Sequence, residues 1–294
     1  MRRFRILLSF LAVLISTAEI QSKEITLFSN FTDPSPRIQG EKDLLERKFV
    51  PASTLKYWIT LYLLERNFAT PSLKITSVET HIPDAPRDLD LREAMYYSSN
   101  SFFLSFFEED PSRYSDFEEF LRKIGFVPTI FKKHFLDKRN LYKSEAVLVS
   151  PKFQHTFMTE FLKDEGKSKG IASKVFLDWK NAAFWSDCAV KNSVVYGKTG
   201  SLSGAFWFSG FLEKKRSFFD RYFRNFPNDY TVITVLQTGT DASREGAIDS
   251  FYRLAGCPRG SIGNEKSFFS EAKSISNNSN DRLILVFRGF FIFQ

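Results

Sequence analysis

The chain has 294 residues, of which 43% are hydrophobic and 26% are charged, and its formal net charge is +7. This balance is that of a globular protein with a sizeable core, and it excludes an intrinsically disordered chain. The lysines and arginines do not gather into blocks with interleaved aromatic residues, so we expect no nucleic-acid partner.

The first residues have the pattern of a secretory signal peptide. In "MRRFRILLSFLAVLISTAEIQS", three arginines precede a short apolar run, and the small residues Ser16 and Ala18 have the spacing of a signal-peptidase site. We predict a signal peptide over residues 1–18, with cleavage as late as residue 22 as a variant, and therefore an exported protein. Its removal lowers the net charge to +4. The apolar run is too short to span a bilayer, so no stable anchor is expected after cleavage; the alternative is an uncleaved N-terminal anchor.

The first part of the mature chain predicts a strand, a loop and a long helix. "EITLF" (residues 24–28) is a strand candidate, and turn-forming residues predict a loop over residues 32–43. A helix is predicted from Ser53 to Arg66, because its apolar residues follow the i, i+3, i+4, i+7, i+8 spacing of one apolar stripe. The residues of this stripe are Leu55, Trp58, Ile59, Tyr62 and Leu63.

Three further helices are predicted in the middle of the chain. "LREAMYYSS" (residues 91–99) predicts a short helix that ends near Ser98. "SDFEEFLRKIG" (residues 115–125) has an N-cap serine, an acidic first turn and a final glycine. A third helix begins with Ser150 as its cap and Pro151 at its first position. Its apolar face comprises Phe153, Phe157, Phe161 and Leu162.

The texture then changes to β-branched and aromatic runs. These are "SVVYGKTG" (residues 193–200), "AFWFSGFLE" (residues 205–213) and "YTVITVLQTG" (residues 230–239). Because the runs lie close together and are broken by glycine-containing turns, they predict an antiparallel meander. A closing helix follows over residues 242–256, capped by Gly256.

This order of elements predicts an α+β fold, with an antiparallel β-sheet flanked by helices and a mostly helical subdomain. The folded domain is expected to span residues 24–256. Residues 258–294 form a low-complexity tail that is predicted to be disordered, in which the polar stretch "SEAKSISNNSNDR" (residues 270–282) precedes a short apolar run, "LILVFRGFFIFQ" (residues 283–294).

The cysteines and histidines support no metal chemistry. An exported chain can join Cys188 and Cys257 in a disulfide, but two buried or unpaired thiols fit the sequence equally well. The three histidines, His81, His134 and His155, are isolated from one another. We therefore predict neither a histidine-based catalytic triad nor a metal site.

Ser53 and Lys56 form the first pattern that points to chemistry. Three residues apart on a predicted helix, the serine hydroxyl and the lysine amine share one face. A serine hydroxyl is a weak nucleophile that needs a base, and burial beside Trp58 disfavours the charged form of a lysine. Free N–H groups at a helix start also suit a developing oxyanion. A second S-x-x-K match, Ser270 to Lys273, lies in the polar tail, so a capped helix with a snorkelling lysine remains the alternative.

Two further motifs follow in a defined order. The segment Ser98-Ser99-Asn100 can relay a proton and hold a substrate amide, although an ordinary helix-ending turn has the same composition. The segment Lys198-Thr199-Gly200 offers positive potential, a hydrogen-bond donor and a glycine that lets a ligand lie against a strand edge. Its alternative is a basic hairpin end. The order S-x-x-K, S-x-N, K-T-G is that of penicillin-binding proteins and serine β-lactamases.

The three motifs resemble those of the class D (oxacillinase-type) serine β-lactamases, within the penicillin-recognising superfamily. The segments that carry the likeness are "FVPASTLK" (residues 49–56), "LREAMYYSSNSFF" (residues 91–103) and "YGKTGSLSGAFWFSGFLE" (residues 196–213). The likeness extends from about Glu24 to Gly256. It implies a bacterial protein of the periplasm or cell envelope whose substrate is a β-lactam or a peptidoglycan peptide. No cofactor is implied other than a carbon dioxide-derived carboxylation of Lys56.

The resemblance also implies roles for single residues. Ser53 corresponds to the acylated nucleophile, Lys56 to the general base and Ser98 to the proton-relay serine. The oxyanion hole corresponds to the backbone N–H groups of Ser53 and Ser201. The oligomeric state is not implied.

The predicted substrate-binding residues are Asn100, Lys198, Thr199, Gly200, Ser201 and Arg244. In the resemblance, Lys198 and Thr199 face the substrate carboxylate. Arg244 corresponds to an arginine that anchors this carboxylate, with a solvated charge at a helix start as the alternative.

Three departures from the class D pattern concern the fate of an acyl-enzyme. Asn100 stands where class D enzymes usually carry an apolar residue, and an amide beside Lys56 makes carboxylation of that lysine less favourable. The Tyr-Gly-Asn element is not found between Arg122 and Ser150, and Tyr142 stands for the tryptophan over the modified lysine. The sequence thus favours a β-lactamase. Its alternatives are a D,D-peptidase or transpeptidase and a β-lactam-binding sensor that stays acylated.

Overall fold

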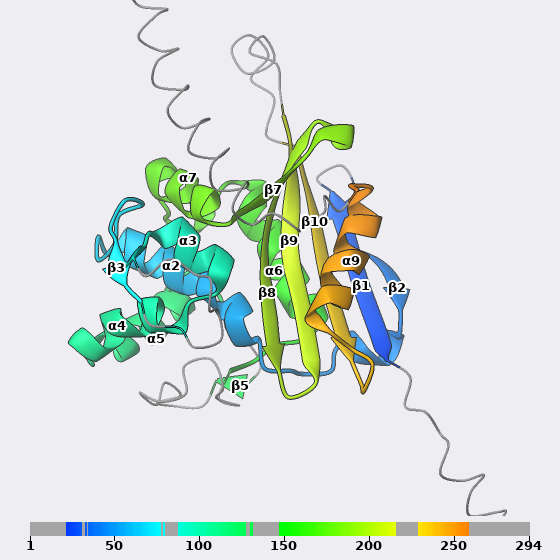
Figure 1. The fold of residues 1–294 in the computed structure, drawn as a ribbon, viewed down its shortest axis with the longest axis horizontal. Helices are drawn as coiled ribbons and strands as arrows, with labels where there is room; N and C mark the ends of the chain where they lie inside the picture. The colour runs from blue at the N-terminus through cyan, green and yellow to red at the C-terminus, as the bar shows by residue number, and fades with distance from the viewer. Residues whose placement is uncertain are drawn as a thin grey trace, which may run out of the picture. The chain divides into compact units, whose positions relative to one another are not determined.

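The computed structural model of the chain describes residues 22–30, 33, 35–77, 79, 88–127, 130–131, 147–215 and 229–258. The predicted signal peptide, Tyr142 and the tail beyond Pro258 lie outside the described residues. Within them, a six-stranded antiparallel sheet is flanked by helices, and further helices gather beside it (Figure 1). The predicted α+β fold is therefore confirmed.

The sheet has the strand order β2-β1-β10-β9-β8-β7, with every neighbouring pair antiparallel. Its strands are β1 (Lys23–Asn30), β2 (Arg37–Gly40), β7 (Phe184–Cys188), β8 (Ser193–Leu202), β9 (Ala205–Lys214) and β10 (Tyr230–Thr238). The predicted meander is confirmed as β8-β9-β10. Strand β1 pairs along its whole length with β10, so the first and the last strands of the domain are neighbours.

Strand β2 lies inside a segment for which the sequence predicts a loop. Residues Arg37–Gly40 pair with β1 and extend the edge of the sheet. The interpretation of residues 32–43 as a loop is therefore wrong for these four residues. Their pairing depends on a partner strand and not on a local apolar pattern, because three of the four are exposed.

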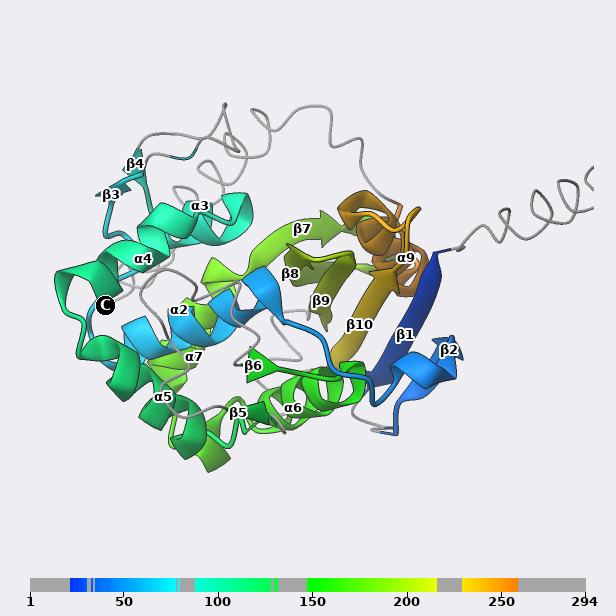
Figure 2. The same ribbon diagram turned by 90° about the horizontal axis from the view of Figure 1, so that it is seen from below.

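The two faces of the sheet bury different cores. Along β9, Trp207 lies in one core and Phe208 in the other, as the alternation of side chains on a strand requires. Helix α6 (Pro151–Lys163) covers the first face and α9 (Arg244–Ala255) the second, and both contact β10. Figure 2 shows these two helices on opposite sides of the sheet.

The predicted caps of α6 and α9 are confirmed. The hydroxyl of Ser150 accepts a hydrogen bond from the N–H of Phe153 at 3.1 Å, and Pro151 is the first helical residue. Gly256 ends α9 with a φ of +64°, in the left-handed region that a side chain disfavours. Local sequence chemistry therefore determines where these two helices begin and end.

The remaining helices form the helical subdomain. They are α2 (Lys56–Glu65), α3 (Leu91–Tyr97), α4 (Asn100–Glu109), α5 (Arg113–Lys123) and α7 (Ser173–Ala182). Short elements complete the described chain: β3 (Ile75–Thr76), β4 (Asp88–Leu89), β5 (Ile130–Phe131), β6 (Val147–Leu148), and the 3-10 helices η1 (Lys42–Leu44), η2 (Ala52–Leu55), η3 (Lys167–Lys169) and η4 (Ala189–Lys191). The sequence did not predict α4 or α7.

Helix α2 corrects the prediction of a single apolar stripe. Every residue from Lys56 to Leu64 is buried, including Thr60 and Tyr57 on the face opposite the stripe. The ring of Trp58, for example, contacts the rings of Phe157, Phe161 and Trp179. An apolar helix without a polar face is typical of the centre of a domain, and α2 occupies that place.

Helix α5 begins earlier than the sequence predicts. Its N-cap is Ser112 and not Ser115, so the predicted start is three residues late. The hydroxyl of Ser112 donates to Asp110 at 2.7 Å and makes no cap bond, so the chain enters the helix from a turn. A Ser-x-x-Glu pattern therefore lies inside the helix. The predicted stop is confirmed, because Gly125 follows α5 with a φ of +80°.

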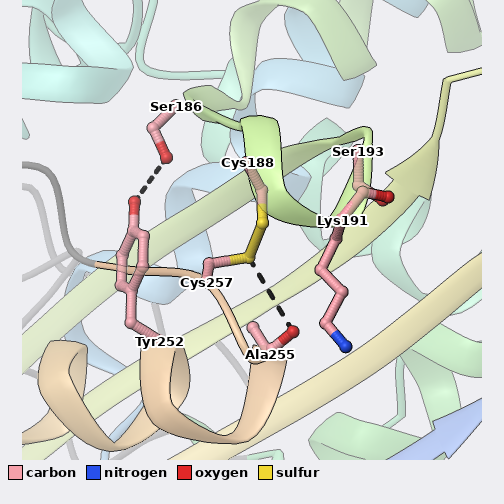
Figure 3. Close-up of a disulfide and its surroundings, with 7 residues drawn as sticks. All are labelled: Ser186, Cys188, Lys191, Ser193, Tyr252, Ala255 and Cys257. Carbon is pink, nitrogen blue, oxygen red and sulfur yellow. Dashed lines mark hydrogen bonds between the residues drawn. A yellow bond between two sulfur atoms is a disulfide. The ribbon is translucent and has the colours of Figure 1, made fainter.

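Cys188 and Cys257 form a disulfide, which decides between the two alternatives that the sequence leaves open (Figure 3). Their Cα atoms lie 5.6 Å apart, and 69 positions separate them in the sequence. The bond joins the end of β7 to the residue after the cap of α9, and Tyr252 of α9 forms a hydrogen bond with Ser186 of β7 nearby.

The described helices include none with the length and apolar character that a membrane crossing requires.

Candidate active site

Ser53 lies in the turn that introduces helix α2. It is the second residue of η2, and its side chain is partly exposed while its neighbours Ala52 and Thr54 are buried. Ala52 has a φ of +49°, a conformation that costs a residue with a Cβ about 1 kcal/mol or more. The hydroxyl of Thr54 donates to the carbonyl of Pro51 at 2.7 Å and helps to hold this turn. The fold thus fixes a strained backbone next to the candidate nucleophile.

Lys56 begins α2 and is completely buried, with 0% of its surface exposed. Its ammonium donates to the backbone carbonyl of Ser98 at 2.5 Å, to the hydroxyl of Ser98 at 3.2 Å and to Oδ1 of Asn100 at 2.8 Å. The ring of Phe103 lies 5.6 Å from Nζ. The first two motifs, 42 and 44 positions apart, therefore meet at this nitrogen.

The surroundings of Lys56 favour its neutral form. Burial is the largest cause and lowers the pKa of its amine from 10.5 to about 7. The nearby Glu79 carboxylate raises this pKa, and the Arg244 guanidinium lowers it. A substantial fraction of the lysine is therefore neutral near pH 7, as a general base requires.

The turn of Ser98 lies between two helices. Ser98 ends α3 with a φ of +59°, and Ser99 is the N-cap of α4, accepting from the N–H of Phe102 at 3.1 Å. Asn100 is the first residue of α4. The left-handed conformation of Ser98 reverses the chain and turns its carbonyl and hydroxyl toward Lys56.

The K-T-G strand packs against the turn of the candidate nucleophile. A Cβ added to Gly200 would lie 2.6 Å from the carbonyl oxygen of Pro51 and 3.2 Å from the backbone nitrogen of Thr54. Only glycine allows β8 to approach η2 this closely. The absence of a side chain at Gly200 therefore lets β8 pack directly against the turn that contains Ser53.

Lys198 is also completely buried, and it lies on the same face of β8 as Gly200. Its ammonium donates to the carbonyl of Thr199 at 3.2 Å. Burial holds its pKa well below the usual value, and the positive charges of Lys56 and Arg244 lower it further. Lys56, Lys198 and Arg244 thus share one electrostatic environment, and a negatively charged ligand bound there would favour the protonated forms of both lysines.

The edge of β8 beyond Gly197 has no strand partner among the described residues. Strand β7 pairs with β8 from Ser193 to Tyr196, and the N–H of Gly197 donates to the carbonyl of Ala183 at 2.9 Å. In the part of the chain that the structure describes, no strand continues this pairing along Lys198–Ser201. An unpaired strand edge can hold the backbone of an extended amide substrate.

Arg244 lies at the start of α9 and is exposed. Its charge acts on both Lys56 and Lys198, so the fold brings it to the same site as the three motifs. The sequence alone could not distinguish this from a solvated charge at a helix start.

Glu79 is a residue of the site that sequence reasoning missed. Its Oε1 accepts from the hydroxyl of Ser99 at 2.6 Å, and from the N–H and hydroxyl of Ser101 at 2.7 and 2.9 Å. It belongs to no helix or strand and to no motif. Only the three-dimensional contact with the Ser98-Ser99-Asn100 segment identifies it.

Trp207 supports the nucleophile turn from β9. Its indole N–H donates to the carbonyl of Val50 at 3.0 Å, two residues before Ala52. The sequence predicts the aromatic strand after K-T-G but not this hydrogen bond. Among the described residues, no group of three or more metal-ligating side chains comes together.

Comparisons with known proteins agree with this arrangement. Residues 16–131 match the family described as the penicillin binding protein transpeptidase domain, and this range includes Ser53, Lys56 and Asn100. A search of curated proteins found no match. Among solved structures, the BPu1 β-lactamase superposes with a TM-score of 0.65 at 17% identity, covering 81% of this chain and 94% of that chain.

Two other solved structures are similar. The class D β-lactamase from Bacillus subtilis has a TM-score of 0.63 at 14% identity, covering 82% of this chain and 94% of that chain. The C-terminal domain of the Bacillus licheniformis BlaR penicillin-receptor has a TM-score of 0.61 at 19% identity, covering 80% of this chain and 91% of that chain. At such identities the structures show a shared fold. The transpeptidase-domain match covers the segment that holds the first two motifs, and the fold is that of serine β-lactamases and of a penicillin-receptor domain.

Proposed function

We propose that this protein is an exported serine acyl-transferring hydrolase of the class D β-lactamase type. The observation that supports the proposal is the convergence of three distant sequence motifs on the buried amine of Lys56 and the adjacent turn of Ser53. A nucleophile, a base of suitable pKa and an unpaired strand edge that carries a lysine are the parts that acyl transfer from a lactam needs.

In the acylation step, Ser53 Oγ attacks the carbonyl carbon of the β-lactam and transfers its proton to the neutral amine of Lys56. The N–H groups of Ser53 and Ser201 stabilise the oxyanion that forms. The C–N bond of the lactam then breaks, and the ring nitrogen takes the proton through Ser98. Lys198, Thr199 and Arg244 hold the carboxylate of the substrate.

In the deacylation step, water attacks the ester carbon of the acyl-enzyme and gives one proton to Lys56. The tetrahedral intermediate releases Ser53 Oγ, which recovers its proton, and the penicilloic acid leaves. If carbon dioxide adds to the neutral Lys56 amine, the resulting carbamate is the base instead. Asn100 borders this position, so the carbamate must form beside an amide.

A long-lived acyl-enzyme is the second candidate function, as in a D,D-peptidase or a β-lactam sensor. The observation that favours it is the 2.8 Å hydrogen bond from Lys56 to Asn100, which stabilises the lysine as a donor and competes with its use as a base. The similarity in fold to the BlaR penicillin-receptor domain is consistent with this candidate.

Export is supported by the disulfide between Cys188 and Cys257. Such bonds persist in oxidising compartments and are rare in the bacterial cytosol. We therefore propose the periplasm or the cell envelope as the site of action, with a peptidoglycan peptide or a β-lactam as the substrate.

One experiment tests the proposal and separates its alternatives. The purified protein is mixed with a penicillin, with and without bicarbonate, and the mass of the Ser53 peptide is followed over time. Rapid loss of the adduct, accelerated by bicarbonate, supports a carboxylated lysine and hydrolysis. A persistent adduct supports the second candidate, and release of D-alanine from stem peptides then indicates a D,D-peptidase. Absence of any adduct, or an adduct that survives in Ser53→Ala, rejects the proposed nucleophile.

A further inference from the structure

A ring of hydroxyl groups surrounds the carboxylate of Glu79. Ser77 Oγ lies 2.9 Å from Ser99 Oγ and 2.5 Å from Ser101 Oγ, and both of these hydroxyls donate to Glu79 Oε1. Ser99 is fully buried and Ser77 is 5% exposed. One carboxylate oxygen accepts from three donors at once, counting the N–H of Ser101, and this is the arrangement expected of the ionised form.

This ring holds the two residues on either side of Asn100. Glu79 binds Ser99 and Ser101, and the residue between them accepts the hydrogen bond of Lys56. The same turn presents the carbonyl of Ser98 to Lys56 at 2.5 Å. The carbonyl of Ser98 and the amide of Asn100, which both accept from Lys56, are therefore held in place by the carboxylate of Glu79.

The charge of Glu79 acts on the same lysine. The charged groups that influence Lys56 come from two directions: Glu79 from its loop and Arg244 from α9. Arg244 is positive and disfavours the ammonium, and Glu79 is the negative group that opposes it. A negative charge here also disfavours a second one on the lysine, such as a carbamate.

We propose that Glu79 is a positioning residue for the base: it fixes the Ser98–Ser101 turn, which presents both hydrogen-bond acceptors to the lysine amine. Its negative charge also favours the protonated amine. Its role in catalysis rests on the proposed acylation of Ser53. Its effect on the titration of Lys56 does not depend on that acylation. The role of Glu79 and the proposed function can therefore be tested separately.

The test compares Glu79→Gln with the wild type. Glutamine keeps an acceptor oxygen at the same place and removes the charge. Glu93→Gln is the matched control, because Glu93 is a carboxylate of the same subdomain that also accepts from a backbone N–H at a helix start, that of Asp90 at 2.9 Å. Glu79→Asp keeps the charge on a shorter side chain.

The titration of Lys56 is followed by the Cε chemical shift in protein labelled with carbon-13 at the lysine ε-position, with the signal assigned from a Lys56→Met variant. We expect Glu79→Gln to move the midpoint to lower pH by about one unit, and Glu93→Gln and Glu79→Asp to leave it near the wild-type position. The rate of penicillin adduct formation should show the same displacement along the pH axis. A Glu79→Gln midpoint equal to that of the wild type overturns the inference, even if Ser53 is acylated. If the wild type forms no adduct, the proposed function fails, and the titration alone still decides the role of Glu79.

Discussion

Lys56 and Asn100 are joined by a hydrogen bond of 2.8 Å from the lysine Nζ to the amide Oδ1. The bond ties the start of α2 to the start of α4, 44 positions later in the chain. Because the amide is a strong acceptor beside an otherwise buried amine, it favours the lysine as a hydrogen-bond donor over a carbamate that needs a dry pocket.

The first prediction concerns this amide. Asn100→Val replaces it by an apolar side chain of similar width, and we expect the penicillin adduct of Ser53 to decay faster in bicarbonate, by about ten-fold or more. Adduct mass against time with and without bicarbonate measures the effect. Asn181→Val, on the exposed side of α7, is the control and should behave as the wild type. An equal lifetime in Asn100→Val and the wild type would show that the amide does not limit deacylation.

The pH dependence of acylation follows from the amine of Lys56. Its pKa is lowered to about 7, mainly by burial, and only the neutral form above that pH can accept the proton of Ser53. The rate of adduct formation should therefore rise with pH and level off above about pH 8. Stopped-flow measurements with nitrocefin between pH 5 and 9 give the profile. A rate that falls across this range would exclude the lysine amine as the base.

Burial of Lys56 also has a cost in stability. Its pKa is lower in the folded state than the usual 10.5, so unfolding takes up protons and the cost grows as the pH falls from about 10 to about 7. We expect Lys56→Met to abolish adduct formation and to raise the free energy of unfolding by about 1–3 kcal/mol at pH 7, with less gain at pH 9.5. Urea unfolding at both pH values measures the change.

A second buried lysine provides the contrast for that experiment. Lys180 forms an ion pair with Glu213 at 2.8 Å, so its removal leaves a buried carboxylate without its partner cation. Lys180→Met should lower the free energy of unfolding by about 2–4 kcal/mol. If both variants lose stability equally, the burial of Lys56 is not the costly feature described above.

Gly200 tests the contact between the strand and the nucleophile turn. In Gly200→Ala the new Cβ would lie 2.6 Å from the carbonyl oxygen of Pro51, so β8 and η2 must move apart. We expect acylation to fall about 100-fold, because small displacements of reacting groups have effects of this size. Gly204→Ala is the control: its φ of +74° makes the substitution strained, but its Cβ would meet no atom within 4 Å. Its stability should fall without a comparable loss of acylation.

The disulfide should matter for stability and not for acylation. In the chain-entropy description, a bond that closes a loop of 69 residues stabilises the fold by about 4 kcal/mol. It lies at the Ser193 end of β8, about 20 Å along the strand from Gly200. The double variant Cys188→Ser, Cys257→Ser should melt at a lower temperature and form the penicillin adduct at an unchanged rate. A large loss of acylation would show that the two ends of β8 are coupled.

Local chemistry explains why much of the fold was predictable. Strands β8, β9 and β10 are consecutive and apolar, and the caps at Ser150 and Gly256 act on their own helices. Strand β2 was missed because its four residues are mostly exposed and become a strand only through β1. The start of α5 was misplaced because the hydroxyl of Ser112 is engaged by Asp110.

The candidate site was predictable where the family pattern is contiguous. The positions of Ser53, Ser98 and Gly200 around one centre follow from three short motifs, and the structure brings these motifs together. Glu79 has no such pattern: it lies 20 positions before Ser99, in a segment without regular structure, and its partners are common serines. Contacts of this kind depend on the packing of the whole helical subdomain.

Helix α2 has no face turned to solvent, and this has a consequence for how the protein can change over generations. Each side chain from Tyr57 to Leu64 is already packed against several neighbours, so almost any replacement there lowers the stability of the fold before it can allow a new substrate. Laboratory selection for activity on bulkier lactams should leave this helix unaltered. Adaptive substitutions should instead accumulate at exposed positions near Ser201 and Arg244, where a change of side chain has little effect on stability.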